Sequence, residues 1–262
     1  MELSSSGLGP FVFSEKTGVR FPVALFYFIS FPFYESAMKV LLFLLFSFIS
    51  VTASADINEV NNSVCKTTSV KEGFMCTAFA FNEDESNIYC LSCGHCYKEE
   101  DVILHLSHNT NLKLIMAKAI YHKFINNTST DVTIIEVAKK DFQDYPLLRP
   151  LKFADSVPKK DEIMWTHGCS LGSWPSAYKG RILPVQDLSG TPIVPDDGMI
   201  YFSPAANVGR SGSPILNDSY EVVGMVNMKA EKGNEIRFGI GVSSTKLLEL
   251  IKEYDDKNSE DK

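Results

Sequence analysis

Positive charge is scarce in this sequence, in which 25 Lys and Arg residues stand against 32 Asp and Glu residues and the formal net charge is −7. A surface with this balance does not attract a phosphate backbone or an anionic lipid headgroup, so we expect no nucleic-acid partner. Internal repeats and low-complexity linkers are also absent. Because 45% of the 262 residues are hydrophobic, we expect a globular domain with a sizeable core.

Uninterrupted apolar runs long enough for a membrane span are missing as well, although the N-terminal region comes close. Phe21–Tyr34 reads FPVALFYFISFPFY and residues 38–55 read MKVLLFLLFSFISVTASA, with Glu35 and Lys39 interrupting the combined stretch. Each run is short for a span of about 20 apolar residues. A lysine, an apolar run and an Ala-x-Ala ending are typical of a secretory signal peptide. We predict a signal peptide over 38–55 after a hydrophobic extension over 1–37, and membrane contact only if this segment stays uncleaved.

Cysteine is present in an even number, and all six residues follow the predicted signal peptide. In an exported chain, an even count indicates disulfides. Zinc binding is the alternative, because the segment from Cys90 to Cys96 packs three cysteines and His95 into seven residues. A strand over NIYCLSC would direct Cys90 and Cys93 to opposite faces, which favours disulfides. The six cysteines are Cys65, Cys76, Cys90, Cys93, Cys96 and Cys169.

Helical periodicity is rare, and short apolar or alternating runs separated by turns take its place. This pattern predicts an all-β sandwich or barrel rather than a parallel sheet. The polar, proline-containing segment Ala154–Glu162 is the expected crossover between two β halves. Only STKLLELIKEY reads as a helix, capped by Ser243 or Ser244, and it precedes a charged tail over 255–262. Leu247, Leu248 and Ile251 are expected on one face of this helix. The runs are FMCTAFAF, NIYCLSC, VILHLS, LKLIMAK, VTIIEV, EIMWT, YKGRILPV, MIYFS, EVVGMVNM and IRFGIG.

The segment GRSGSPIL, Gly209–Leu216, has two glycines around a serine just before an apolar run. Glycine costs backbone entropy in regular structure, so a conformation that other residues disfavour is expected here. A serine hydroxyl becomes a nucleophile when a base removes its proton and nearby donors stabilise the oxyanion that forms. We therefore predict Ser211 as a nucleophile, with Ser213 as the competing serine in a structural role.

A histidine and a carboxylate stand upstream in an informative order. His95 lies where an apolar run ends in YCLSCGHCY, and Asp131 lies where a polar loop enters an alternating run in NTSTDVTIIEV. The order His, Asp, Ser is that of the chymotrypsin arrangement and differs from the orders of subtilisin and of the α/β-hydrolases.

Five segments carry a resemblance to a known family. LSCGHC, DVTIIEV and VGRSGSPILNDSYEVVGMV resemble the histidine, aspartate and serine segments of the chymotrypsin/trypsin-like serine peptidases. THGCSLGSWPSAYKGRI and FGIGVSSTKLLELI resemble the bacterial branch with the HtrA-type proteases and glutamyl endopeptidases. Together they cover most of residues 70–254. The resemblance implies a double six-stranded antiparallel β-barrel with a C-terminal helix, and a peptidase domain over 56–254.

The resemblance also implies roles for single residues. His95 would be the general base, Asp131 would orient it, and Ser211 would form an acyl-enzyme. The amides of Gly209 and Ser211 would form the oxyanion hole, and Cys76 and Cys96 would be joined as half-cystines. No cofactor or metal is implied. The residues implied to form the substrate pocket are Ser203, Ala205, Gly224 and Val226.

Arg210 departs from the family pattern, in which many relatives carry Asp or Asn before the nucleophile. In trypsin-type zymogens an acid at this position pairs with a newly cut N-terminal amine, and an arginine cannot make that ion pair. Activation by such a cleavage is therefore not expected. No acid appears among the implied pocket residues either, which disfavours cleavage after Lys or Arg.

Three functions follow from these observations. The first is a secreted or periplasmic serine endopeptidase that hydrolyses protein or peptide substrates. The second is a catalytically inactive trypsin-like domain that acts as a binding module. The third is a zinc-stabilised β domain built on the cluster from Cys90 to Cys96.

Overall fold

Two closed barrels of six antiparallel strands make up most of the described structure. The computed structural model describes residues 57–97, 101–108, 111–184, 198–232 and 235–260. In the first barrel the strands neighbour one another in the order β1, β2, β3, β6, β5, β4. Their bounds are β1 Val64–Ser69, β2 Met75–Glu83, β3 Asn87–Ser92, β4 Asp101–His108, β5 Asn111–Phe124 and β6 Asp131–Ala138. The prediction of a double six-stranded barrel is confirmed.

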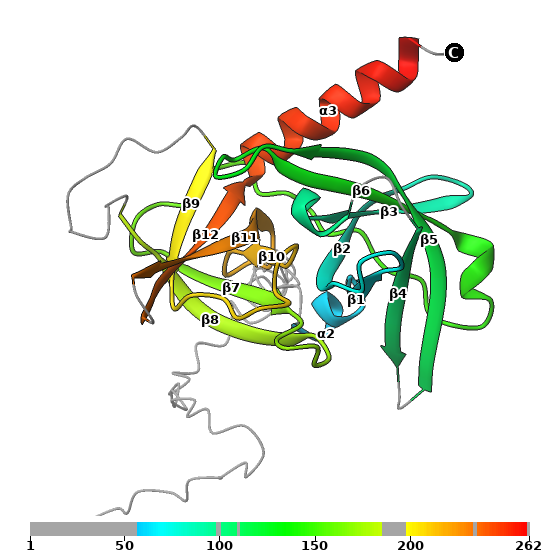
Figure 1. The fold of residues 1–262 in the computed structure, drawn as a ribbon, viewed down its shortest axis with the longest axis horizontal. Helices are drawn as coiled ribbons and strands as arrows, with labels where there is room; N and C mark the ends of the chain where they lie inside the picture. The colour runs from blue at the N-terminus through cyan, green and yellow to red at the C-terminus, as the bar shows by residue number, and fades with distance from the viewer. Residues whose placement is uncertain (1–56, 98–100, 109–110, 185–197, 233–234, 261–262) are drawn as a thin grey trace, which may run out of the picture. The chain divides into compact units, whose positions relative to one another are not determined.

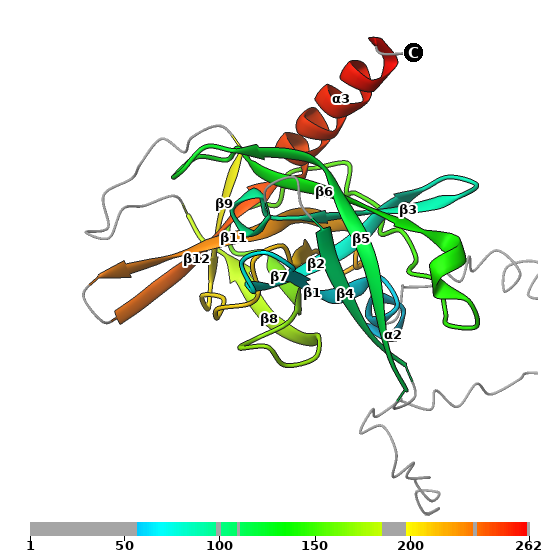
Figure 2. The same ribbon diagram turned by 45° about the vertical axis from the view of Figure 1, so that its right-hand side comes forward.

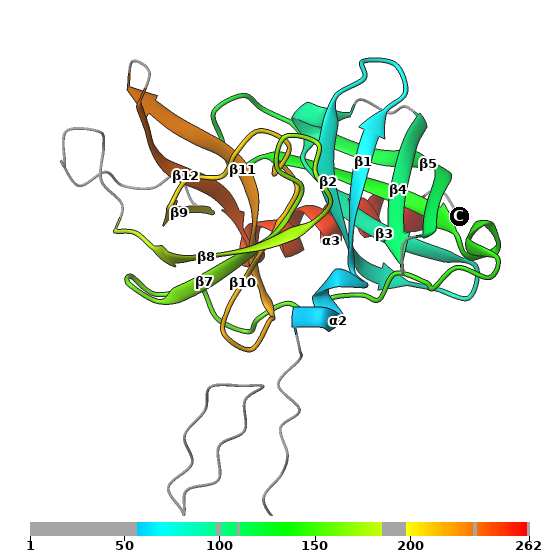
Figure 3. The same cartoon turned by 90° about the horizontal axis from the view of Figure 1, so that it is seen from below.

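The second barrel follows in the chain and lies beside the first (Figure 1). Its strands are neighbours in the order β10, β11, β12, β9, β8, β7. Figures 2 and 3 show the two barrels side by side from two further directions. The strand bounds are β7 Ile163–Gly168, β8 Ser176–Ile182, β9 Met199–Ser203, β10 Pro214–Leu216, β11 Val222–Lys232 and β12 Glu235–Ser243.

The ten predicted strands are all present, but two strands of the structure lack a signal in the sequence. The first, β1, reads VCKTTS, and its polar side chains hide the alternation although Lys66 and Thr68 are its only half-buried members. The second, β10, has three residues and begins with a proline, which cannot donate to a ladder. Pairing with β11 and β7 makes it a strand, so tertiary context decides it.

The connection between the barrels runs from the short 3-10 helix η2, Lys139–Phe142, to β7. It contacts both barrels, because the Leu151 amide donates to the Ala80 carbonyl and the Ala154 amide donates to the Val222 carbonyl. The predicted crossover, Ala154–Glu162, forms the last part of this connection.

Apolar side chains fill both barrels, and the cluster that fills the first continues to Leu216, Val222 and Met225 of the second. In β5 the side chains of Ile115, Ala117 and Ala119 are buried while their neighbours Met116 and Lys118 are exposed, as expected for a strand with one face on a core. The largest buried side chains of the first barrel include Phe79 and Tyr97, and Met164, Phe202 and Ile215 fill the second. This rigid frame positions the loops at the barrel junction.

The C-terminal helix α3, Ser244–Glu260, follows β12, begins where the two barrels meet and extends outward past β6 (Figure 1). Leu247 and Leu250 are buried while Leu248 is exposed, so the predicted face with Leu247, Leu248 and Ile251 is wrong at Leu248. The helix also continues past residue 254 into the predicted tail. Glu253 explains this extension, since it pairs with Lys257 one turn later and with Lys123 of β5.

The N-terminal part of the described chain is a short helix, α2, Ile57–Asn61, which precedes β1. The predicted signal peptide over 38–55 and the extension over 1–37 lie outside the described residues and stay predictions. Among the residues that the structure describes, no helix is both long and apolar enough to cross a membrane.

Candidate functional site

His95 and Asp131 meet because of the strand register of the first barrel. β3 pairs with β6 so that Ser92 lies opposite Thr133, which places the end of β3 beside the start of β6. The chain then turns through the 3-10 helix η1, Gly94–Cys96. Gly94 is needed in this turn, because an added Cβ would lie 2.8 Å from the Lys123 carbonyl oxygen. The predicted histidine and aspartate are therefore brought together.

Two hydrogen bonds join His95 to the fully buried Asp131. The His95 backbone amide donates to Asp131 Oδ1 at 2.8 Å, and Nδ1 of the ring lies 2.7 Å from Oδ2. Because a carboxylate only accepts, Nδ1 carries the proton and Nε2 is left as an acceptor. The Asp131 carboxylate and burial together raise the pKa of the neighbouring Cys93 thiol, with burial the larger cause.

Ser211 directly follows a turn that glycine makes possible. The Arg210 amide donates to the Asn207 carbonyl at 3.1 Å, and Gly209, the third residue of this turn, has φ +92°. These are the features of a type II turn. Gly212 has φ +85°, and an added Cβ there would meet the Thr77 carbonyl oxygen at 2.0 Å. The predicted need for glycine on both sides of the serine is thus met by conformation and by space.

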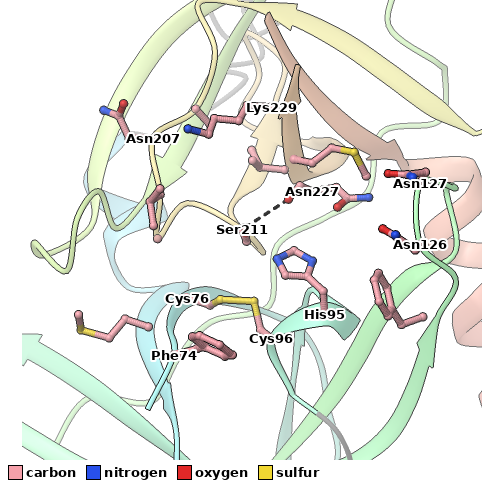
Figure 4. Close-up of a pocket in the computed structure, with 17 residues that line it drawn as sticks. Phe74, Cys76, His95, Cys96, Asn126, Asn127, Asn207, Ser211, Asn227 and Lys229 are labelled. Atoms are coloured by element: carbon pink, nitrogen blue, oxygen red, sulfur yellow. Dashed lines mark hydrogen bonds between the residues drawn. A yellow bond between two sulfur atoms is a disulfide. The ribbon is translucent and has the colours of Figure 1, made fainter. Parts of the chain in front are cut away.

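The Ser211 hydroxyl donates to the Asn227 carbonyl oxygen at 3.2 Å rather than to His95. One edge of the His95 ring nevertheless faces Ser211 across the same open cleft (Figure 4). This cleft has a volume of about 610 Å³ and is lined by residues of both barrels. The amides of Gly209 and Ser211 donate no hydrogen bond to any described residue, which leaves them able to meet an oxygen in the cleft.

The predicted substrate pocket only partly coincides with the cleft. Val226 lines it, but Ser203, Ala205 and Gly224 do not, and Ala206 and Asn207 lie there instead. Gly224 pairs with Ser243 inside the β11–β12 ladder, where an added Cβ would meet the Val242 carbonyl oxygen at 2.5 Å. The absence of a side chain at Gly224 therefore allows β11 and β12 to pack closely, and it does not open space for a substrate.

Sequence reasoning missed two residues that shape the site. The hydroxyl of Thr77 of β2 accepts from the Cys169 amide and donates to the Gly209 carbonyl at 2.9 Å. The Thr77 backbone amide donates to the Ser211 carbonyl. Asn227 is 3% exposed, lines the cleft, and its side-chain Nδ2 has no hydrogen-bond partner among the described residues. Both residues lie in runs that predict strands, but no local pattern gives either a role in the site, since those roles come from contacts with the turn around Ser211.

The cysteines differ from the expectation that all six form disulfides. Cys76 and Cys96 are bonded, as the resemblance implied, while Cys65, Cys90, Cys93 and Cys169 are free and buried. Cys90 interacts with Cys65 inside the first barrel, whereas the Cys93 thiol donates to the Val226 carbonyl of the second. Cys93 and Cys96 both lie near His95, but Cys90 is directed to the other face of the strand and Cys96 is bonded to Cys76, so the four side chains of the proposed zinc cluster do not form one ligand set.

A thiol count tests this arrangement. We expect four titratable thiols in the denatured protein without reductant, six after reduction, and almost no fast-reacting thiol in the native protein, because all four are buried and burial raises the pKa of Cys169 to about 12. The measurement is titration with a chromogenic disulfide, with Cys76→Ser as the control that adds one thiol. A count of zero before reduction would contradict the structure.

Comparison with known families decides the lineage. The model of the trypsin-like peptidase domain matches residues 76–225, which include both His95 and Ser211. The chain belongs to the trypsin-like peptidase family. A search of the curated proteins finds no match.

Solved structures described as proteases share this fold at low sequence identity. An inactive form of Rv3671c from M. tuberculosis H37Rv is 18% identical with a TM-score of 0.57, over 78% of this chain and 92% of that one. The serine endoprotease from Yersinia pestis is 13% identical with a TM-score of 0.56, over 75% and 64%. The HtrA-type protease AlgW, solved with a tripeptide, is 16% identical with a TM-score of 0.58, over 76% and 62%.

Proposed function

We propose that this chain is an exported serine endopeptidase that cleaves proteins or peptides through an acyl-enzyme. The observation that carries the proposal is the arrangement around the cleft. A buried carboxylate holds Nδ1 of His95, the other edge of the ring faces Ser211, and the two amides beside Ser211 are not engaged by described residues. Nucleophile, base and oxyanion donors thus line one space that a peptide can enter.

The chemistry follows from these contacts. When a peptide carbonyl lies over Ser211, rotation of the side chain turns Oγ from the Asn227 carbonyl toward His95. Nε2 takes the hydroxyl proton as Oγ bonds to the carbonyl carbon, and Asp131 stabilises the imidazolium through Nδ1. The amides of Gly209 and Ser211 donate to the oxyanion. His95 then returns the proton to the departing amine as the C–N bond breaks.

Water completes the turnover by the same route. His95 removes a proton from a water molecule that attacks the acyl carbon, and the Ser211 oxygen leaves and regains the proton. The base, the nucleophile and the oxyanion donors in these steps are all groups of the chain, and no step calls for a cofactor. The peptide backbone and its side chains would lie along the cleft, where Phe74, Phe124 and Met228 supply apolar lining.

Export rests on the sequence of the N-terminal region. The pattern over 38–55 is typical of a signal peptide, and the Cys76–Cys96 disulfide persists most readily in an oxidising compartment. We infer a secreted or periplasmic enzyme. N-terminal sequencing of the protein recovered outside the cytoplasm would test the boundary, and a start at Asp56 is the expected result.

Labelling with a fluorophosphonate tests the catalytic assembly. We expect intact mass spectrometry to show one adduct on residues 56–262, because the reagent phosphonylates, with loss of fluoride, only a serine activated by a base and an oxyanion hole. Ser211→Ala should lose the adduct entirely, whereas Ser213→Ala, which changes the serine two residues later, should keep it. A folded protein without an adduct would favour the binding-module alternative.

A further inference from the structure

Arg210, the residue before the proposed nucleophile, points into the second barrel and is 3% exposed. Its guanidinium reaches three separate segments. Nε donates to Ser170 Oγ at 2.8 Å, Nη1 donates to the carbonyl and hydroxyl oxygens of Thr166 at 3.2 and 2.7 Å, and Nη2 donates to the carbonyl and hydroxyl oxygens of Ser176 at 2.8 and 3.0 Å.

These five contacts match the five N–H donors of a guanidinium, so the buried group is fully hydrogen-bonded. No carboxylate pairs with it in the described part of the chain; the acceptors are all uncharged. The Tyr178 ring lies 5.4 Å from the guanidinium carbon and adds a contact with its face. Burial lowers the pKa of Arg210, but an arginine stays charged in proteins, so the cation has to be held by geometry.

The contacts tie the turn around the nucleophile to the loop between β7 and β8. Arg210 is bound to both ends of this loop, through Thr166 before it and Ser176 after it. The loop returns a bond of its own, because the Leu171 amide donates to the Val208 carbonyl at 2.7 Å. Gly209 packs directly against this loop, since an added Cβ would lie 2.9 Å from the Cys169 carbonyl oxygen. The loop therefore holds the residue before Gly209 through the Val208 carbonyl and the residue after it through the Arg210 side chain.

We propose that Arg210 is a positioning residue that holds the amides of Gly209 and Ser211 toward the cleft from inside the second barrel. Because all its partners lie within the β7–β8 region, the oxyanion donors are assembled without a newly cut chain terminus. The inference rests on the proposed peptidase function for its consequence in catalysis. Its structural part, the order of the turn over Asn207–Ser213, stands by itself.

Arg210→Met keeps the length and apolar stem of the side chain and removes all five donors. We expect the rate of fluorophosphonate labelling at saturation to fall about 10²–10³-fold, the loss typical of an oxyanion donor, while the half-saturating concentration stays nearly unchanged. Arg210→Lys should recover part of the rate, because an ammonium can donate to Thr166 or Ser176 but cannot span all three partners. Arg181→Met, at an exposed arginine of β8, is the matched control and should label like the wild type.

Hydrogen–deuterium exchange on the same proteins decides the structural part. In Arg210→Met we expect exchange over 205–213 and 169–176 to speed up at least tenfold, with the segments of the first barrel unchanged. Exchange as slow as in the wild type, or full labelling by Arg210→Met, would overturn the proposal. If the wild type itself does not label, the proposed function fails, and the exchange data still decide whether Arg210 orders the turn.

Discussion

Asp131→Asn is expected to lower kcat about 10⁴-fold at neutral pH while the protein stays folded. The amide keeps the size of the carboxylate, but its NH₂ group donates where Oδ2 now accepts from His95 Nδ1. The ring would then carry its proton on Nε2, which faces Ser211 and has to accept the hydroxyl proton. The remaining side-chain oxygen, at the position of Oδ1, would still accept from the His95 amide, so the η1 turn would keep its anchor. Steady-state hydrolysis and fluorophosphonate labelling both measure the loss.

Asp155→Asn is the matched control, because it changes an exposed aspartate of the inter-barrel connection. It should leave the rate and the labelling unchanged. A kcat for Asp131→Asn within tenfold of the wild-type value would show that the carboxylate does not set the tautomer of His95. In that case the two hydrogen bonds of Asp131 would serve only the folding of the η1 turn.

The second large effect is a loss of stability in mild acid that depends on His167 of β7. This histidine is 2% exposed, and neither ring nitrogen has a hydrogen-bond partner among the described residues. Burial, with a smaller contribution from the Arg210 charge, lowers the pKa of His167 from 6.5 to about 4. The unfolded chain therefore binds the proton more tightly than the folded one. Stability is fully present above pH 6.5 and falls as the pH drops toward 4, by about 3 kcal/mol at 1.36 kcal/mol per pKa unit.

Urea unfolding at pH 7.5, 5.5 and 4.5 measures this effect, in the Ser211→Ala background so that self-digestion does not interfere. His167→Phe fills a similar volume without a titrating group and should remove most of the acid dependence, and His167→Leu serves if the larger ring does not fit. His105→Phe, at a half-buried histidine of the first barrel, should keep most of it. An equal slope with pH in His167→Phe and the wild type would contradict the assignment.

Segments with a strong local pattern were predictable, and segments shaped by distant contacts were not. The run VTIIEV is mostly apolar and forms β6, in which only Glu136 of the run is not fully buried. Gly209 and Gly212 indicated the positive φ values of the turn around Ser211. β10 has too few residues for any local signal, and it is a strand because β11 and β7 flank it. The prediction that Leu248 lies on the buried face of α3 was wrong for a related reason, since the position of β11 and β12 decides which side of the helix is covered.

The site divides in the same way. Local sequence was sufficient to single out His95, Asp131 and Ser211, because each stands in a segment whose neighbours indicate a turn at the end of a strand. Contacts between separate segments were needed to recognise Thr77, which bonds to Gly209 of the other barrel, and Asn227, whose carbonyl accepts from Ser211 16 residues earlier in the chain. The same holds for the cysteines, of which an even count predicts pairs but only the packing shows four buried thiols.

Residue types and their near neighbours were enough to establish the class of fold, the order of histidine, aspartate and serine, and the two glycines that let the serine turn form. How that turn is held depends on residues that only the folded chain brings into contact. Arg210 reads in the sequence as a departure from the family pattern, and in the folded chain it meets acceptors on Thr166, Ser170 and Ser176. A guanidinium can be buried where a fixed set of acceptors surrounds it. Pairing of β7 with β8 assembles these acceptors, and pairing of β10 with β7, which closes the second barrel, brings Arg210 to them.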